Sequence, residues 1–309
     1  MSELANINVD NYDDLARAMG MATEKKAPKK TSTLNRLRIW HSPIMGKVEV
    51  NGKPTNVEVI EGGAYRLEVV SEDSSFYIFS KNITIRPFMQ RFMLKRYVAN
   101  QGAKGGEKKG SFHRTIMADS LNIDLKDNTG RFNCGKPSGY VEDFQALPKS
   151  TQDLIRQIKR VRVLFGTVSM EDPVDEKGVP VENFSDSPFI WEVDNKDAFK
   201  TFGDLFSELS EKSRLPIQHA MHLNGTHANQ LPNGSSFYTP IVEVDYTESF
   251  EINDEDKKLF GEFSMFIKGF NDWVCKEWDT NVQKRQGDVG EADQEIIEGF
   301  IDIDTEEVQ

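Results

Sequence analysis

Short runs in which apolar and polar residues alternate begin at Leu34, and they constrain the fold of this 309-residue chain more than any other feature. Alternation with a period of two predicts a strand with one buried face. Two such runs flank Asn51-Gly52, the dipeptide that most strongly indicates a hairpin. Similar runs lie at 36–40, 65–70, 76–79 with its extension 83–86, 116–125, 160–170, 189–193 and 237–244. We therefore expect a sheet built from many short strands.

Helices are predicted at 10–21, 150–159, 197–212 and 254–281. The segment 197–212 has Phe199, Phe202 and Leu209 at the spacing that places apolar side chains on one side of a helix. Between residues 86 and 97, long side chains follow one another without a clear period, so this stretch fits either a strand or a helix. The helices and the strands together must supply one core.

Strands followed by helices favour an α+β domain. We expect its core to be a small antiparallel β-barrel or a curved sheet, and specifically an elaborated barrel of the oligonucleotide-binding (OB) type with flanking helices. The chain then has three parts. Residues 1–33 form an N-terminal helix and a basic flexible arm, 34–286 form the OB-like core domain, and 287–309 form an acidic tail.

Charge is divided between the two halves of the chain. Residues 1–166 contain 27 Lys and Arg against 18 Asp and Glu, and residues 167–309 contain 11 against 32. The overall net charge of −12 therefore hides a basic first half. The last 23 residues hold nine acids and no base. Asymmetry of this kind indicates a polyanionic partner or an acidic interaction tail.

The strongest candidate site is the segment 76–114, where aromatic and basic residues are interleaved and Glu107 is the one acid after residue 80. An aromatic ring beside a cation suits an unpaired nucleotide, because the base can stack while the phosphate is neutralised. The alternative is an ordinary solvated face over a core that takes some of these rings. The residues expected to contact nucleic acid are Tyr77, Phe79, Lys81, Arg86, Arg91, Lys95, Arg96, Tyr97, Lys104, Lys108, Lys109, Phe112 and Arg114 from this segment, and Lys136, Tyr140, Arg160 and Arg162 from outside it.

The acidic tail contains apolar residues among its acids, which a tail that only solubilises would not need. We expect it to dock partner proteins or to cover a basic groove when nucleic acid is absent. The alternative is that 294–303 forms the last element of the fold. The residues expected to dock partners are Ile297, Phe300, Ile301, Asp302 and Asp304.

The layout of the segment 76–114 and the tail 288–309 resembles that of the single-stranded DNA-binding proteins of bacteriophages. The resemblance implies an elaborated OB barrel, an aromatic and basic groove, and an acidic tail that contacts replication and recombination enzymes. It concerns organisation and not a short motif. This chain ends in Val308-Gln309, whereas some members of that family end in an aromatic residue. The resemblance implies that the protein acts in viral DNA replication, recombination or repair.

Other chemistry has weaker support. Gly130 to Lys136 matches the spacing of a phosphate loop, but Pro137 replaces the hydroxyl residue that such a loop requires. His219, His222 and His227 can at most offer part of a metal site, since neither cysteine is near them in sequence. We expect no enzyme, no cofactor and no metal.

The two cysteines and the acidic N-terminus predict a protein of a reducing compartment without a secretory signal. We expect it in the cytoplasm, or in the host cytoplasm if it is viral, without contact with a membrane. The competing function is a virion structural or assembly protein whose basic and acidic halves associate between subunits as a homo-oligomer.

Overall fold

The structure is a computed structural model that describes residues 34–50, 53–70, 74–100, 110–138, 141–182, 184–231 and 234–288. The chain divides into two units, Met1–Thr33 and Leu34–Gln309, and every described residue belongs to the second unit. Several predictions fall outside the described residues. They concern the helix at 10–21, the basic arm, the acidic tail with Ile297, Phe300, Ile301, Asp302 and Asp304, and the side chains Lys104, Lys108, Lys109 and Tyr140.

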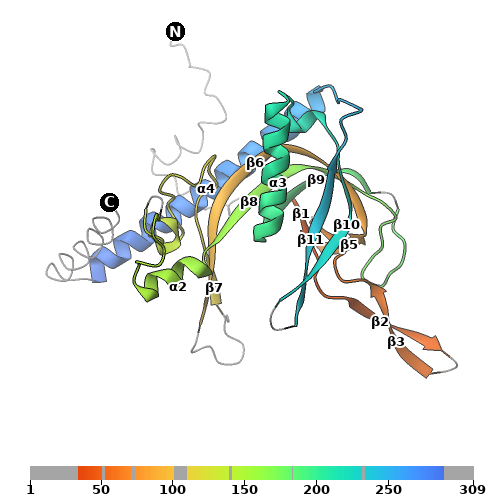
Figure 1. Cartoon of the computed structure of the whole chain (residues 1–309), viewed down its shortest axis with the longest axis horizontal. Helices are drawn as coiled ribbons and strands as arrows, with labels where there is room; N and C mark the ends of the chain where they lie inside the picture. The colour runs from red at the N-terminus through yellow and green to blue at the C-terminus, as the bar shows by residue number, and fades with distance from the viewer. Residues whose placement is uncertain are drawn as a thin grey trace, which may run out of the picture. The chain divides into compact units, whose positions relative to one another are not determined.

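The described residues form eleven strands and three α-helices (Figure 1). The strands are β1 (Asn35–Ile39), β2 (Ile44–Val50), β3 (Lys53–Ile60), β4 (Tyr65–Val70), β5 (Ser75–Ser80), β6 (Asn82–Ala99), β7 (Gly110–Arg114), β8 (Lys159–Met170), β9 (Phe184–Val193), β10 (Met221–Gln230) and β11 (Ser236–Val244). The helices are α2 (Lys149–Gln157), α3 (Lys196–Glu211) and α4 (Asp254–Asp288). The predicted α+β class is confirmed.

Nine of the strands form one sheet in the order β11-β10-β6-β8-β9-β1-β4-β5, with β7 paired to β6 beside this path. All pairs are antiparallel except β1 with β9. Strands β2 and β3 form a separate antiparallel pair up to Val50 and Lys53, which confirms the predicted hairpin.

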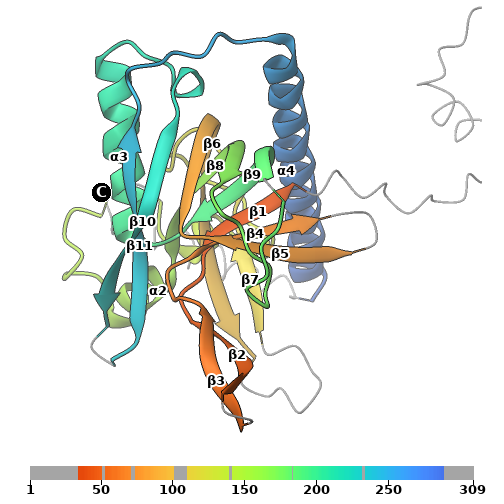
Figure 2. The same ribbon diagram turned by 90° about the vertical axis from the view of Figure 1, so that its right-hand side faces the viewer.

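The described sheet is open, because β11 and β5 lie at opposite ends of the order. The expected closed barrel is therefore wrong. A barrel buries one face of a sheet inside itself, whereas here helices lie on both sides of the sheet (Figure 2). On one side Phe202 of α3 packs against Trp191, and on the other Phe263 of α4 packs against Phe165. The core therefore has two layers that share the sheet.

Strand β6 settles the ambiguous stretch between residues 86 and 97 as part of an 18-residue strand. It pairs with β8 from Ile83 to Lys95 on one edge. Its other edge pairs with β10 in the first half and with β7 in the second half. Because β6 pairs with β10, β8 and β7, it links the strands under α3 to the hairpin formed with β7.

The strand expected at 116–125 is not formed. The segment after β7 makes isolated bridges, such as Thr115 with Asp127, and its backbone is held by α4. The side chain of Asn271 accepts a hydrogen bond from the Met117 amide (2.7 Å) and donates one to the Met117 carbonyl (2.9 Å). A side chain of the helix thus takes the place of a neighbouring strand.

Helix α4 begins with a reciprocal cap. The Asn253 side chain accepts from the Asp256 amide (2.9 Å), and the Asp256 carboxylate accepts from the Asn253 amide (3.0 Å). Asp256 also receives two hydrogen bonds from the Arg86 guanidinium, at 2.8 and 2.9 Å. This ion pair joins the start of α4 to β6. In the part of the chain that the structure describes, no helix has the length and apolar content needed to span a membrane.

Candidate nucleic-acid interface

A cleft lies where β1 and β9 meet. These strands pair at only two positions, Asn35 with Phe189 and Arg36 with Ile190. The residues that follow on both strands line a cleft of about 710 Å³, together with residues of β6, β7 and α4. A partly split sheet offers a concave surface without any need for a barrel.

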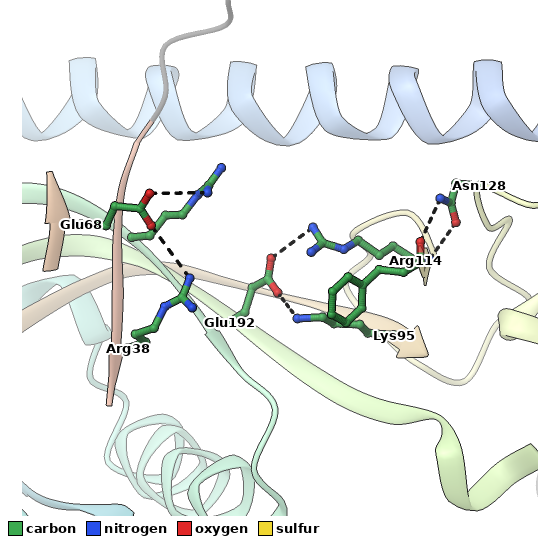
Figure 3. A network of polar contacts seen from close by, with 8 residues as sticks. Arg38, Glu68, Lys95, Arg114, Asn128 and Glu192 are labelled. Carbon is green, nitrogen blue, oxygen red and sulfur yellow. Dashed lines mark hydrogen bonds and ion pairs between the residues drawn. The ribbon is translucent and has the colours of Figure 1, made fainter. Parts of the chain in front are cut away.

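Two arginines of β1 enter this cleft on the same face of the strand. Arg36 and Arg38 are two residues apart, so the pleat points them the same way. Each has one guanidinium nitrogen 4.0 Å from a Glu68 carboxylate oxygen (Figure 3). Their side chains are 56% and 49% exposed. Loose pairs of this length leave most guanidinium donors available to a ligand.

A second pair of cations comes from the β6–β7 hairpin. Lys95 and Arg114 are directly opposite each other in the register of the two strands. Glu192 of β9 lies between them, 2.7 Å from the Lys95 ammonium and 3.6 Å from the Arg114 guanidinium (Figure 3). The Asn128 side chain accepts a hydrogen bond from the Arg114 amide at 2.8 Å and so fixes the end of β7.

These four basic side chains share two carboxylates, and Asp194, which also lines the cleft, pairs with Lys159 at 3.0 Å, so these residues together keep a surplus of two positive charges. Figure 3 places Arg38, Lys95 and Arg114 between the sheet and α4. Low-dielectric walls strengthen the attraction of such a surplus for an anion. The arrangement can therefore neutralise phosphates.

An exposed pair of aromatic rings continues the site along the hairpin. Tyr97 and Phe112 are register partners, with ring centroids 5.0 Å apart. They are 47% and 44% exposed, which is high for large apolar rings. The Lys95 ammonium lies 5.0 Å and the Arg114 guanidinium 5.3 Å from the centre of the Phe112 ring. Rings held beside cations can stack on bases whose phosphates the cations bind.

The cleft thus brings together Lys95, Phe112 and Arg114 of the predicted contact residues, with Tyr97 beside them. Several others hold ion pairs or hydrogen bonds elsewhere. Lys81 pairs with Glu61 (2.8 Å), Arg91 with Asp119 (3.1 Å), and Arg96 donates to Gln157 (3.3 Å).

Lys136 and Arg160 do not line the cleft, whereas Tyr77 is the register partner of Glu68 and so lies beside the carboxylate that Arg36 and Arg38 share. Burial, followed by the nearby charge of Arg160, lowers the pKa of Lys136, and Arg160 itself is exposed at the start of β8. The ring of Tyr77 lies 4.5 Å from the Arg66 guanidinium. These three residues remain predictions for nucleic-acid contact.

For Phe79, Arg86 and Arg162 the placement corrects the expectation. Phe79 is 1% exposed and packs in a core cluster, so its ring cannot stack on a base. Arg86 is committed to Asp256 and to the Ile217 carbonyl, which accepts from its Nε at 2.6 Å. Arg162 is 6% exposed and lies against α3. These side chains hold the fold together.

Arg36 and Arg38 are not among the residues predicted to contact nucleic acid, although the sequence contains a signal for them. The run 36–40 was recognised as a strand, and its alternation already placed both arginines on one face. What the run could not indicate is the partner strand. Trp40, at its end, also lines the cleft, and its ring lies 4.2 Å from the guanidinium of Arg66.

The other motifs do not form a site among the described residues. His219 is buried, and its Nδ1 lies 3.1 Å from two backbone carbonyl oxygens, those of Asp245 and Glu248. His222 instead contacts Thr84 at 3.0 Å, and His227 is exposed. No cluster of three or more His, Cys, Asp or Glu side chains suited to a metal occurs in the described part. Asn133–Gly135 forms a compact 3₁₀ turn.

In comparisons with protein-family models, with curated proteins and with solved structures, none matches this chain. The geometry of the cleft is therefore the basis for the function proposed below.

Proposed function

We propose that this protein binds single-stranded DNA without sequence preference, as a non-enzymatic accessory protein of viral replication, recombination or repair. The observation that carries the proposal is the surplus of positive charge in the cleft beside the Tyr97 and Phe112 rings. Phosphates would lie on Arg36, Arg38 and Arg114, and bases would stack on the exposed rings.

The geometry favours a single strand over a duplex for a physical reason. Unpaired bases expose their faces, whereas a duplex hides them in its stack, so only a single strand can use both the rings and the cations. The binding mode would be OB-like in that a sheet surface and a hairpin hold the strand. The open sheet would replace the barrel as the support.

The acidic tail completes the proposal. Its nine acids would compete with phosphates for the basic cleft, and Ile297, Phe300 and Ile301 would dock replication or recombination proteins together with Asp302 and Asp304. The protein would act in the cytoplasm, that of the host if it is viral.

A fluorescence-anisotropy titration tests the proposal. A labelled single strand of about 30 nucleotides, long enough for several OB-type sites, is compared with its duplex at low and moderate salt. We expect a salt-sensitive preference for the single strand. Equal binding of both forms, or no binding at low salt, would refute the proposal. Either result would favour the assembly function, and sedimentation at low salt should then detect large homo-oligomers.

A further inference from the structure

A second pocket lies under α3, on the other side of the sheet from Lys95 and Arg114. It has a volume of about 540 Å³. Arg162 of β8 forms its floor, because its neighbours Val161 and Val163 pack in the layer on the α4 side. The pocket is lined by Gln90, Phe92, Arg162, Phe199, Lys200, Gly203, Asp204, Phe206, Ser207 and Ser210.

The Arg162 guanidinium is held in an aromatic cage. Its central carbon lies 4.7 Å from the ring centre of Phe199, 5.0 Å from that of Phe92 and 5.8 Å from that of Phe206. Gly203 makes this position available, since a Cβ atom there would lie 2.8 Å from Nη2 of Arg162. The side chain is thus fixed in place.

The hydrogen bonds of this guanidinium are incomplete. Its Nη1 donates to the Gln90 side-chain oxygen, while its Nε finds no hydrogen-bond partner among the described residues. No carboxylate in that part of the chain lies within ion-pair distance of it. Burial lowers the pKa of Arg162 to about 10, against the opposing influence of Asp204. A buried guanidinium without a carboxylate is unfavourable, and an anion that reached it would offset the loss of solvation.

We propose that this pocket binds a carboxylate on a slender apolar stem, such as an acidic side chain of a partner peptide. The cation is 6% exposed and walled by three rings, so only a narrow group can reach it. A phosphodiester is flanked by two sugars and is too wide. A carboxylate accepts planar, paired hydrogen bonds from a guanidinium, and its stem gains apolar contact with the rings. The site is independent of the proposed DNA-binding function.

Butyrate is a suitable probe, because it joins a carboxylate to a short apolar chain. Saturation-transfer NMR on the butyrate methyl signal reports its binding to the full-length protein and to each variant. We expect saturable binding to the wild type and a loss of about tenfold or more in Arg162→Lys, because Lys cannot reproduce the planar fork. Arg156→Lys, at an exposed position of α2, is the matched control and should bind as the wild type does.

Gly203→Ala is a second variant, and it tests the site even if Arg162→Lys does not fold. Ala favours a helix over Gly, so α3 should persist while the added methyl group displaces the guanidinium. Weaker butyrate binding by this variant supports the site. Equal binding by the wild type and Arg162→Lys, or binding that appears only after Asp204→Asn, overturns it. Displacement of butyrate by inorganic phosphate at equal concentration overturns the carboxylate class.

Discussion

Replacing Arg36 and Arg38 together by Gln removes half of the cations that define the cleft. Both guanidinium groups are about half exposed and share the Glu68 carboxylate at 4.0 Å; that side chain is 15% exposed, and the amide groups of the two Gln side chains can still donate hydrogen bonds to it. The group of four cations and two carboxylates loses its positive surplus. We therefore expect the variant to fold normally and to bind single strands more weakly.

The magnitude follows from counterion release. Each phosphate contact to a single strand contributes about −0.7 to the slope of log K against log salt. Two lost contacts should reduce the steepness of that slope by about 1.4. The advantage of the wild type over the variant should then be about sevenfold larger at about 50 mM than at about 200 mM salt.

The assay is the anisotropy titration repeated over a salt series. Lys257→Gln combined with Lys258→Gln is the matched control, because it removes the same charge from exposed positions at the start of α4. Arg36→Lys with Arg38→Lys keeps the charge and should keep most of the slope. The reasoning fails if the Gln variant retains the wild-type slope, or if the control pair lowers the slope as much.

Three further predictions concern stacking, the tail and the fold. Tyr97→Ala or Phe112→Ala should each weaken single-strand affinity by about 1–3 kcal/mol in the same titration, with little change in thermal stability; unchanged affinity would exclude stacking on these rings. Removal of residues 287–309 should tighten binding at low salt, and identical affinities before and after truncation would remove the competitive role of the tail. Asp256→Asn should lower the free energy of unfolding in urea by about 3–5 kcal/mol at neutral pH, since it leaves Arg86 without its charge partner. Burial acts to raise the pKa of Asp256, but the hydrogen bonds from Arg86 and the Asn253 amide and the charge of Arg86 outweigh it, so the pKa is lowered. The ionised carboxylate therefore stabilises the fold above the ordinary pKa of Asp. The difference in unfolding free energy between wild type and variant should narrow as pH falls below about 4. A gap that stays constant with pH would contradict this account of the carboxylate.

The spacing of apolar residues was sufficient to predict an element whose structure depends mainly on its own residues. The amphipathic spacing placed α3 within one residue of its observed bounds. The prediction of α4 began at the right residue and ended seven residues early, because the final turns lack a clear apolar face in the sequence. Phe79 and Arg162 show the opposite case, since the buried side of their alternating runs depends on distant segments: Phe79 packs in a cluster with Ile60 and Ala64, and Arg162 lies against Phe199 of α3.

The sequence by itself determined the α+β class, the existence of most strands and the amphipathic helices, because a period of two or of 3.6 is a property of neighbouring residues. The tertiary structure alone decided that the sheet stays open, that β1 lies parallel to β9, and that Arg36 meets Glu68 beside the Lys95 and Arg114 pair. Strands far apart in the chain pair according to the packing of whole faces against α3 and α4, and no local period encodes that choice.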